Sequence, residues 1–367
     1  MAPKTIIKSC FIVLIILAVV SCKDNSSENN THNNSNQNIE IFKNNLTILT
    51  PMEGSVYAIG DSIYFDIETS DKSIPDSIVV YYNSKSIINL TKSPFRITWK
   101  AQDVKVGKNS FRIASYQKGK KVDQKFISLI FKSDIVPEKI EYKIIRKLKH
   151  NPNNYTQGFV YENGYIYEGT GKRGQSHIEK YEPANIEPIQ SISNENSIFG
   201  EGIVIVNDKI VQLTYTSNIG FIYDKTTFKR LGSFDFYTEG WGLTYDGNQL
   251  IMSDGSNNLY YLDKNTYTKT GQIEVYDNNG PVVMLNELEY IDGKIYANIY
   301  GKDVIVIIDT KTGKVLSKID CSKLRPENLP FDTEYAFNGI AYNPENKHLY
   351  VTGKYWPVTY ELELIIK

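Results

Sequence analysis

A small set of polar residues recurs beside short strands in the C-terminal part of the chain, and these residues have the types needed for proton transfer. The set comprises one carboxylate, two amides and one ammonium group: Glu201, Gln157, Asn286 and Lys354. A carboxylate can take and return a proton, and amide or ammonium donors can stabilise negative charge on an oxygen. Aromatic residues stand near the same strands: Tyr155, Phe199, Tyr215, Trp241 and Tyr300. Polar groups enclosed by aromatic walls are typical of a small-ligand pocket.

The same part of the chain repeats. Five anchors each begin a short apolar strand, which is followed by a polar turn and a second apolar strand: Gly158, Gly202, Gly242, Leu288 and Gly339. Successive anchors are between 40 and 51 residues apart. A period of about 40–50 residues built from strands alone predicts propeller blades, so residues 136–367 are expected to form a five-bladed β-propeller. Equivalent positions of the blades would converge on the axis and bring the polar and aromatic residues together.

Other residues of the repeats are expected at defined places in this arrangement. Asn338 stands beside the last anchor and Glu168 lies in a second strand, so both are expected near the axis. Glu287 and Glu289 share one strand face, which favours a structural role and leaves open a structural calcium ion near the axis. Residues 140–148 alternate as a strand and are expected to supply the outer strand of the last blade, because this pairing would cover an exposed edge.

A separate all-β module is expected before the repeats, over residues 45–134. Short alternating runs are separated by turn signals, and their spacing predicts a β-sandwich: Leu46–Leu49, Ser62–Ile67, Ser77–Tyr82, Phe95–Trp99, Asn109–Ser115 and Lys125–Phe131. The stretches Ser93–Trp99 and Val106–Asn109 resemble a bacterial immunoglobulin-like module. We see no chemical constellation in this segment, so a spacer or adhesion role is the default expectation.

The N-terminal segment has the pattern of an export signal. Phe11 to Val20 is an apolar run of ten residues, too short to span a bilayer but suited to a signal-peptide core. The segment that ends at Cys22 resembles a bacterial lipoprotein signal, with residues 1–22 as the signal peptide and Cys22 as the lipidated residue; an ordinary secretory signal is the alternative. Residues 23–44 are polar and predict a flexible tether. We therefore expect a lipid-anchored protein of the bacterial cell envelope, on the periplasmic side or the outer-membrane surface.

Composition excludes some functions and limits others. The formal net charge of −1 and the pI near 6.5 argue against nucleic-acid binding, which needs a basic excess. Of the three cysteines, Cys321 alone would remain beyond the signal and the lipidation site, so no internal disulfide is expected and Cys321 is expected to be a small buried residue. The four histidines lack a zinc-ligand spacing. The residues give no sign of a required metal or organic cofactor.

Residues 136–367 resemble the plant- and bacterial-type glutaminyl cyclases, which are five-bladed propellers unrelated to the zinc-dependent animal enzymes. The matching segments lie in order along the repeats: Tyr155–Gly158, Gly171–Ser176, Phe199–Gly202, Asn218–Asp224, Gly240–Leu243, Ser253–Gly255, Leu285–Tyr290, Ala297–Tyr300, Asn338–Ala341 and Val351–Pro357. The resemblance implies conversion of the N-terminal glutamine of peptides or proteins into pyroglutamate, with release of ammonia and without a cofactor.

The resemblance also implies roles for particular residues. Glu201 corresponds to the family's proton-transferring carboxylate, acting as general acid and base. The polar residues that correspond to the lining of the pocket are Gln157, Asn286 and Lys354, and those that correspond to its aromatic walls are Phe199 and Trp241. Three wall positions depart from the plant pattern but stay aromatic: Tyr155 replaces Phe, and Tyr215 and Tyr300 replace Trp.

Two other functions fit parts of the pattern. A non-catalytic propeller could bind peptides or glycans at the cell surface, but such a binder would have little use for the full polar set. A metal-dependent sugar lactonase would have a similar blade pattern, but it normally carries six blades and an axial carboxylate–Asn metal site. Five repeats argue against the lactonase.

Overall fold

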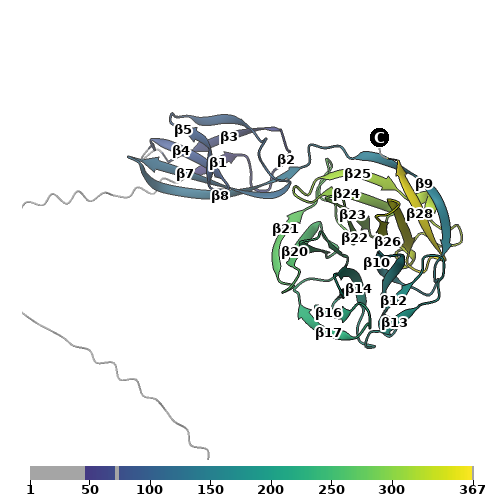
Figure 1. Cartoon of the computed structure of the whole chain (residues 1–367). Coiled ribbons are helices and arrows are strands. Elements are labelled where there is room, and N and C mark those ends of the chain that lie inside the picture. Colours follow the sequence, from purple (N-terminus) through teal and green to yellow (C-terminus); the bar gives the residue numbers. More distant parts are fainter. Residues whose placement is uncertain (1–45, 71–73, 366–367) are drawn as a thin grey trace, which may run out of the picture. The chain divides into compact units, whose positions relative to one another are not determined.

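The computed structural model describes residues 46–70 and 74–365 (Figure 1). These residues form twenty-eight β-strands and two 3₁₀ helices of three residues each, η1 (Ser322–Leu324) and η2 (Thr333–Tyr335). The expected all-β class is therefore confirmed. The predicted signal peptide, the tether and the lipidation site at Cys22 lie outside the described residues. Within the described ranges, no helix has the length and apolar character that a membrane span requires.

The N-terminal strands form two sheets. Their bounds are β1 (Thr47–Thr50), β2 (Val56–Ala58), β3 (Ser62–Glu68), β4 (Ser77–Tyr82), β5 (Lys85–Leu90), β6 (Phe95–Lys100), β7 (Gly107–Gln117) and β8 (Lys120–Lys132). One sheet has the order β1-β3-β6 and the other the order β2-β8-β7-β4-β5. All six strands expected from the sequence are present, although their ends differ by a few residues.

Two strands of these sheets, β2 and β5, were not predicted. β5 follows β4 through a two-residue turn in which Asn83 and Ser84 have φ values of 46° and 64°. A two-residue turn with positive φ at both positions is the typical hairpin connection, so Asn83 was an available signal. β2 has three residues and pairs in parallel with β8, and so short a strand leaves no alternation to detect.

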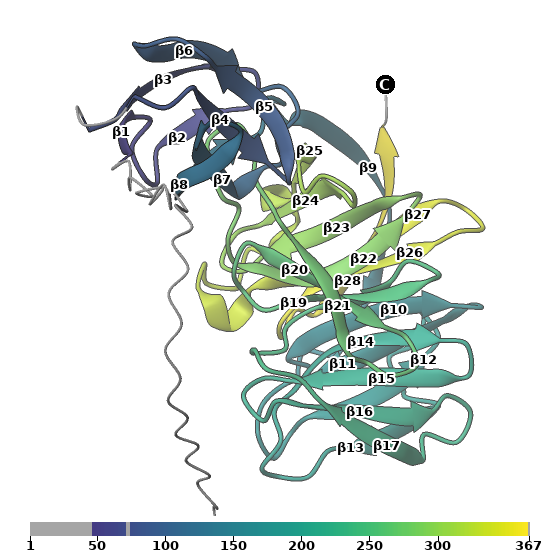
Figure 2. The same cartoon turned by 90° about the vertical axis from the view of Figure 1, so that its left-hand side faces the viewer.

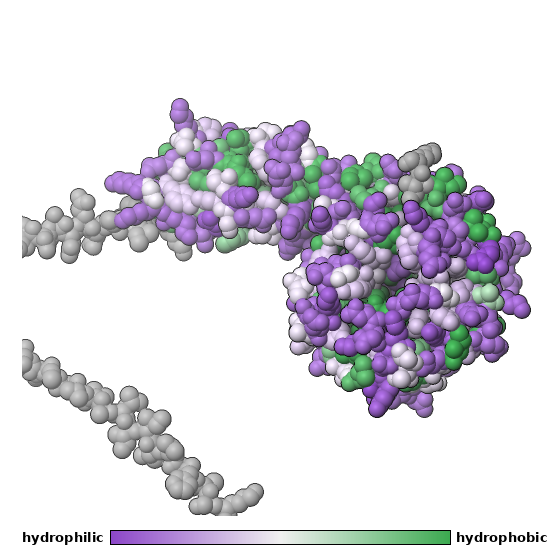
Figure 3. Space-filling view, in the orientation of Figure 1, coloured by the Kyte–Doolittle hydropathy of each residue, from purple (hydrophilic) through white to green (hydrophobic). Residues whose placement is uncertain are grey.

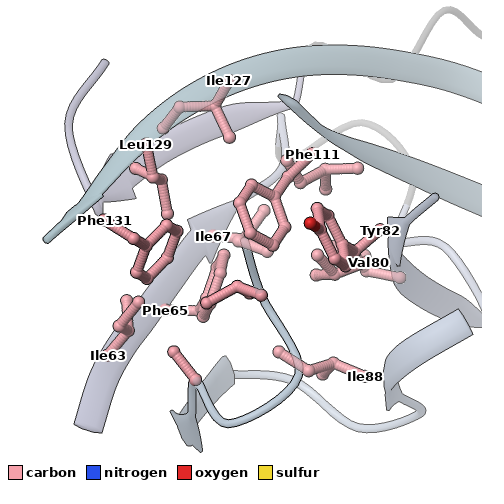
Figure 4. Packing of buried hydrophobic residues seen from close by; sticks show 14 of the residues in the cluster. Ile63, Phe65, Ile67, Val80, Tyr82, Ile88, Phe111, Ile127, Leu129 and Phe131 are labelled. Carbon is pink, nitrogen blue, oxygen red and sulfur yellow. The ribbon is translucent and has the colours of Figure 1, made fainter. Parts of the chain in front are cut away.

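The inward-facing side chains of the two sheets make one apolar core. Figure 4 shows Phe65 of β3, Phe111 of β7 and Phe131 of β8 in contact with aliphatic side chains from neighbouring strands. All three phenylalanines are fully buried. Alternating apolar residues on facing sheets produce such a core, because successive side chains of a strand point to opposite faces.

The remaining strands form a second set of sheets. Their bounds are β9 (Glu138–Lys149), β10 (Thr156–Glu162), β11 (Tyr165–Thr170), β12 (His177–Tyr181), β13 (Gln190–Ser193), β14 (Gly200–Val206), β15 (Lys209–Thr214), β16 (Ile219–Asp224), β17 (Arg230–Asp235), β18 (Leu243–Tyr245), β19 (Gln249–Ser253), β20 (Asn258–Asp263), β21 (Lys269–Glu274), β22 (Leu285–Ile291), β23 (Lys294–Ile299), β24 (Val304–Asp309), β25 (Val315–Asp320), β26 (Phe337–Asn343), β27 (His348–Gly353) and β28 (Val358–Ile365).

These strands pair in sequence order within groups. The groups β10–β13, β14–β17 and β18–β21 are separate four-stranded antiparallel sheets. The first strand of each group contacts that of the next, from β10 through β14, β18 and β22 to β26, and β26 contacts β10. Figure 1 looks along this arrangement, with the first strands innermost, and Figure 2 shows β10–β13 beside β14–β17. We call the set formed by β9–β28 the sheet ring.

One eight-stranded sheet closes the sheet ring, with the order β22-β23-β24-β25-β9-β28-β27-β26. β9 pairs antiparallel with β28 over most of its length, and its first residues pair in parallel with β25. The prediction that residues 140–148 supply the outer strand beside the last hairpin is therefore confirmed. Pairing on both sides leaves β9 without a free edge in this region.

Glycine at the start of the first strands permits a close approach between neighbouring groups. A Cβ atom added to Gly202 would lie 2.5 Å from the carbonyl oxygen of Trp241, and one added to Gly242 would lie 1.9 Å from that of Asn286. Both positions exclude any larger side chain unless the backbone moves. The repeated anchors therefore reflect the spacing of strands around the centre of the sheet ring. In the orientation of Figure 1 this part of the molecule presents a mostly hydrophilic face, hollowed near its centre (Figure 3).

Candidate active site

A cavity of about 190 Å³ lies among the residues singled out from the sequence. Nine residues line it: Tyr155, Gln157, Phe199, Glu201, Tyr215, Trp241, Asn286, Tyr300 and Lys354. These are the nine candidate catalytic and binding residues, and they stand in or beside the strands β10, β14, β15, β18, β22, β23 and β27. The structure thus places the nine together, while their roles in catalysis and binding stay predictions.

Backbone irregularities present the polar side chains to the cavity. The pairing register of β10 shifts between Thr156 and Gly158, at the position of Gln157. The register shifts likewise in β14 at Glu201 and in β22 at Asn286. A β-bulge bends a strand and re-aims a side chain, and bulges are frequent beside active sites. The same irregularity in successive first strands therefore presents functional groups from different sheets to one space.

The cavity has a polar interior and aromatic walls. Gln157, Glu201, Asn286 and Lys354 are each between 2% and 4% exposed. The aromatic residues that surround them are Tyr155, which is buried, and the half-buried Phe199, Tyr215, Trp241 and Tyr300. Neighbouring rings touch in the walls, with centroids 5.5–6.1 Å apart for Tyr155–Phe199, Phe199–Tyr215 and Trp241–Tyr300. A ligand that binds at the polar groups must therefore lose its hydrating water.

Glu201 is a buried carboxyl group with few compensating contacts. Gln157 Nε2 donates a hydrogen bond to Glu201 Oε1 over 3.0 Å. Burial raises the pKa of Glu201 well above its ordinary value, and the charge of Glu239 raises it further, although the Lys354 ammonium acts in the opposite direction. A carboxyl group with a raised pKa can both accept and return a proton near neutral pH.

Lys354 is the buried cation of the cavity. Burial lowers its pKa to about 8, partly offset by the attraction of Glu201. Its ammonium group lies 4.5 Å from the ring centroid of Tyr155 and 4.8 Å from that of Tyr300. Aromatic faces attract cations, so the two rings help to hold the ammonium group within the cavity.

Asn286 offers an unused hydrogen-bonding atom. Its side-chain oxygen, Oδ1, is buried and has no hydrogen-bond partner among the described residues. An unpaired buried acceptor costs free energy, and such atoms are rare unless a ligand or water completes them. Because Asn286 lines the cavity, Oδ1 is positioned to accept a hydrogen bond from a bound molecule.

Glu168 was expected near the axis with these groups, but the structure places its carboxylate in a separate network of buried side chains. Its carboxylate accepts hydrogen bonds from Thr156 Oγ1 at 2.7 Å and from the hydroxyl of Tyr181 at 2.8 Å. It also pairs with His150, whose Nε2 lies 3.2 Å away. Glu168 is fully buried and does not line the cavity. We call His150, Thr156, Glu168 and Tyr181 the buried quartet.

Three further residues that were expected near the centre form hydrogen bonds with backbone groups. Glu287 accepts hydrogen bonds from the amides of Phe159 at 3.2 Å and Ile340 at 2.8 Å, and so ties first strands to one another. Glu289 accepts one from Tyr342 at 3.0 Å. Asn338 donates to the carbonyl oxygen of Thr156 and does not line the cavity. These contacts agree with the structural role expected for the two glutamates.

No group of three or more His, Cys, Asp or Glu side chains is arranged to hold a metal ion in residues 46–70 and 74–365. Cys321 is fully buried, as expected, and burial raises the pKa of its thiol. Neither observation adds a reactive group to the cavity.

Charged residues that contact the aromatic walls of the cavity were missed by the sequence reasoning. Lys172 Nζ lies 2.8 Å from Glu334 Oε1 and 4.2 Å from the ring centroid of Tyr155. Glu239 accepts a hydrogen bond from Trp241 Nε1 at 3.0 Å. Lys172 could have been noticed in the segment Gly171–Ser176, but its partner is 162 residues away and no local pattern points to it.

Comparisons with known proteins show the family to which this chain belongs. A family model described as "Glutamine cyclotransferase" matches residues 120–364, and one described as "Bacterial Ig domain" matches residues 45–113. A glutaminyl-peptide cyclotransferase of Arabidopsis thaliana is 34% identical over 230 residues, which cover 61% of this chain and 71% of that protein. The crystal structure of Myxococcus xanthus glutaminyl cyclase aligns with a TM-score of 0.59 and 31% identity, over 63% of this chain and 100% of that one. The chain belongs to the glutamine cyclotransferase family.

Proposed function

We propose that this chain is a glutaminyl-peptide cyclotransferase that closes the N-terminal glutamine of peptides and proteins into pyroglutamate and releases ammonia. Membership of the family supports the reaction. The observation that carries the assignment of roles is Glu201, a buried carboxyl group with a raised pKa inside an aromatic-walled cavity. No observation favours the non-catalytic propeller that would bind peptides or glycans.

The reaction needs one proton carrier. The α-amine of the substrate attacks the carbon of its own γ-carboxamide, so a C–N bond forms within the molecule and the bond to the amide nitrogen breaks. A free α-amine has a pKa of roughly 8, so much of it is protonated at neutral pH. Glu201 removes a proton from the nitrogen that attacks and delivers one to the nitrogen that leaves as ammonia.

The other polar groups complement this transfer. Lys354, with a pKa of about 8, is largely charged at neutral pH and can stabilise negative charge that develops on the amide oxygen. Oδ1 of Asn286 can accept a hydrogen bond from the substrate amine. Gln157 keeps the Glu201 carboxyl oriented through its hydrogen bond. The aromatic walls fold the glutamine side chain back towards its amine, which matters because an intramolecular reaction depends on orientation.

The proposed architecture is a five-bladed propeller over residues 136–367, preceded by an immunoglobulin-like sandwich over residues 45–134. Five strand groups whose first strands contact one another in turn support this interpretation. In it, β9 is the outer strand of the last blade. Each blade then contributes at least one residue to the cavity.

We propose that the chain reaches the bacterial cell envelope as a lipoprotein. Residues 1–22 would be the signal peptide, Cys22 the acylated residue and residues 23–44 the tether; the sequence pattern supports this. The membrane would then be contacted through the lipid, and the partners would be peptides or proteins that begin with glutamine. Incorporation of labelled palmitate in cells, compared with a Cys22→Ser variant, tests the anchor.

We propose that turnover requires no metal or organic cofactor, because Glu201 and Lys354 can supply the proton transfer and the charge stabilisation. A structural calcium ion near Glu287 and Glu289 stays a prediction. Both carboxylates already accept backbone hydrogen bonds, which leaves them fewer free lone pairs for a cation. Metal analysis of the purified protein checks this.

Ammonia release from a glutamine-initiated peptide, measured with and without EDTA, tests the proposal. Turnover that survives EDTA supports a metal-independent cyclotransferase. Correctly folded protein that releases no ammonia from several glutamine peptides would contradict the activity and favour the binding propeller. Turnover that EDTA abolishes would contradict the metal-independent mechanism.

A further inference from the structure

An ion pair that the reaction itself does not use lies against the aromatic wall of the cavity, and we take its exposed position to mark the entrance. Lys172 and Glu334 are 29% and 46% exposed, whereas the polar groups inside the cavity are at most 4% exposed. The ammonium of Lys172 also lies over the ring of Tyr155, which lines the cavity. The pair therefore lies against a wall residue of the cavity and is more exposed than the polar groups inside it. We call Lys172 and Glu334 the rim pair.

Both members of the rim pair are held in place by neighbouring structure. Lys172 follows β11, and the next residue, Arg173, donates hydrogen bonds to the carbonyl oxygen of Ser197 at 3.1 Å and to Thr216 Oγ1 at 3.0 Å. Glu334 lies in η2, where its amide donates to the side chain of Asp332 at 2.7 Å. The loop that begins after β11 is thus tied to segments on both of its sides, and the two charges have defined positions.

A peptide substrate must pass this rim. If its first residue places the amine and carboxamide among the buried polar groups, the second residue follows within roughly 3.3–3.6 Å along the chain. The backbone that leaves the cavity therefore carries the second side chain past the entrance. Because Lys172 contacts the same Tyr155 ring as Lys354 of the cavity, we expect this side chain to come within reach of the rim charges.

We propose that the rim pair determines which residues are accepted directly after the N-terminal glutamine. This inference rests on the proposed cyclotransferase function. Paired, the two charges cancel and the entrance tolerates acidic, basic and neutral second residues. Unpaired, Lys172 selects acidic second residues and Glu334 selects basic ones.

The other charges of the entrance do not mask this effect. Arg173 is bound to neutral oxygen atoms, and Glu239 is bound to the indole N–H of Trp241. These two charges, and the carboxylate of Asp332 beside Glu334, are the same in the wild type and in the rim-pair variants. Removal of one partner therefore changes the local net charge by one unit, towards the sign of the partner that stays.

The test measures kcat/KM of the full chain for three amidated peptides that differ in the second residue, which is Ala, Glu or Lys. The wild type is expected to turn over the Glu and Lys peptides within about twofold of each other. Interactions between exposed charges are screened, so each single variant should shift the Glu-to-Lys ratio by about fivefold. Glu334→Gln should favour the Glu peptide, and Lys172→Gln should favour the Lys peptide.

Two further variants separate charge selection from general damage. The reversed pair, Lys172→Glu with Glu334→Lys, should return the ratio to the wild-type value. Lys225→Gln is the matched control: Lys225 pairs with Glu162 over 2.7 Å at 22% and 29% exposure, at the opposite end of β10 from Gln157. This variant should keep the wild-type ratio. At about 1 M salt, where the Debye length falls to about 3 Å, the shifts should largely vanish.

The Ala peptide distinguishes failure of the rim-pair proposal from failure of the cyclotransferase function. If the wild type cyclises the Ala peptide but both single variants keep the wild-type ratio, the role of the rim pair is overturned and the cyclotransferase function stands. If the wild type cyclises none of the three peptides, the function fails and the inference fails with it. Opposite shifts in the two variants support both.

Discussion

Two buried glutamates in the sheet ring have opposite properties. Glu201 is 4% exposed and Glu168 is fully buried, so burial alone would penalise the charge of both. Yet the pKa of Glu201 is raised well above its ordinary value, whereas the pKa of Glu168 is lowered. Both residues were expected near the axis from the sequence, and the structure separates them into a cavity and the buried quartet.

The difference comes from the donors around each carboxylate. Burial pushes the pKa of Glu168 upward, but His150, Thr156 and Tyr181 overcome it through a positive charge and hydrogen bonds. Glu201 has Gln157 as a neutral donor within the described residues, and the Lys354 ammonium acts on it without a direct ion pair. A carboxylate whose lone pairs are satisfied holds structure together, while an under-satisfied one can change its protonation state during a reaction.

The basic groups beside the two glutamates, His150 and Lys354, also differ in the direction of their pKa shifts. Burial would lower the pKa of His150, but Glu168 and the carbonyl oxygen of Trp356, 2.6 Å from Nδ1, leave it raised. The pKa of Lys354 is instead lowered to about 8, because burial outweighs the attraction of Glu201. Glu168 and His150 of the buried quartet therefore stay charged over a wide pH range. Glu201 and Lys354 of the cavity instead change protonation state more readily. The predictions below test this contrast.

The largest effect is expected from Glu201→Gln. Loss of the proton carrier should lower kcat for ammonia release by about 1,000-fold, within the range typical of a general acid–base. The matched variant is Glu168→Gln, which removes another buried carboxylate outside the cavity. Per folded molecule it should stay within about tenfold of the wild type, since general acid–base losses are confined to groups that touch the reacting atoms. Similar losses of kcat in the two variants would contradict the assignment of proton transfer to Glu201 alone.

Lys354→Met should lower kcat by about 100-fold, the cost typical of one lost donor to a developing oxyanion. It should also change the pH profile. In the wild type, kcat should rise as Glu201 loses its proton and fall as Lys354 loses its own near pH 8. The variant should lack the alkaline decline. An unchanged alkaline limb would show that another group causes it.

Glu168→Gln should destabilise the fold more than it affects chemistry. Removal of one partner from a buried ion pair typically costs about 3 kcal/mol, because the other charge stays buried. The lowered pKa of Glu168 stabilises the fold above the unfolded value of 4.5, and this is lost as the pH falls through the folded value. The raised pKa of His150 stabilises below 6.5, and this is lost as the pH rises through the folded value.

The quartet is therefore expected to contribute most between pH 4.5 and 6.5. Urea unfolding of the wild type and of Glu168→Gln across this range measures the contribution. If the wild type and Glu168→Gln have the same free energy of unfolding at pH 5.5, the pair is not ionised in the folded protein.

The smallest effect is expected from Tyr181→Phe. This variant removes one hydrogen bond to Glu168 and should cost about 1 kcal/mol of stability. Activity per folded molecule should not change, because Tyr181 does not line the cavity. Thermal unfolding and ammonia release on one preparation check both statements. Loss of turnover without loss of stability would place the quartet in the chemistry.

The sequence was informative where the repeat set the geometry. Equivalent positions beside the anchors led to Gln157, Glu201 and Asn286, because a bulge recurs there in successive first strands. Lys354 was named with the second strands and through the family resemblance, and the structure places it directly after β27. Tyr215 and Tyr300 were named on the same grounds, and they directly follow β15 and β23.

Glu168 was misplaced for the corresponding reason. It lies inside β11, three positions before the residue that follows that strand, so its side chain points into the packing between strands. Local pattern could not distinguish these positions before the end of the strand was known. The rim pair was out of reach altogether, because an ion pair between residues 162 positions apart has no local signature.

A titration of the Glu201 carboxyl group tests the central claim most directly. Infrared difference spectra of the wild type against Glu201→Gln, recorded from acid to alkaline pH, would isolate this carboxyl band. We expect Glu201 to lose its proton well above 4.5, its ordinary value, while Glu168 stays ionised in the same samples. A Glu201 carboxyl that is already ionised at pH 4.5 would contradict the account, because the cavity would then hold an ordinary carboxylate and not a group prepared to carry a proton.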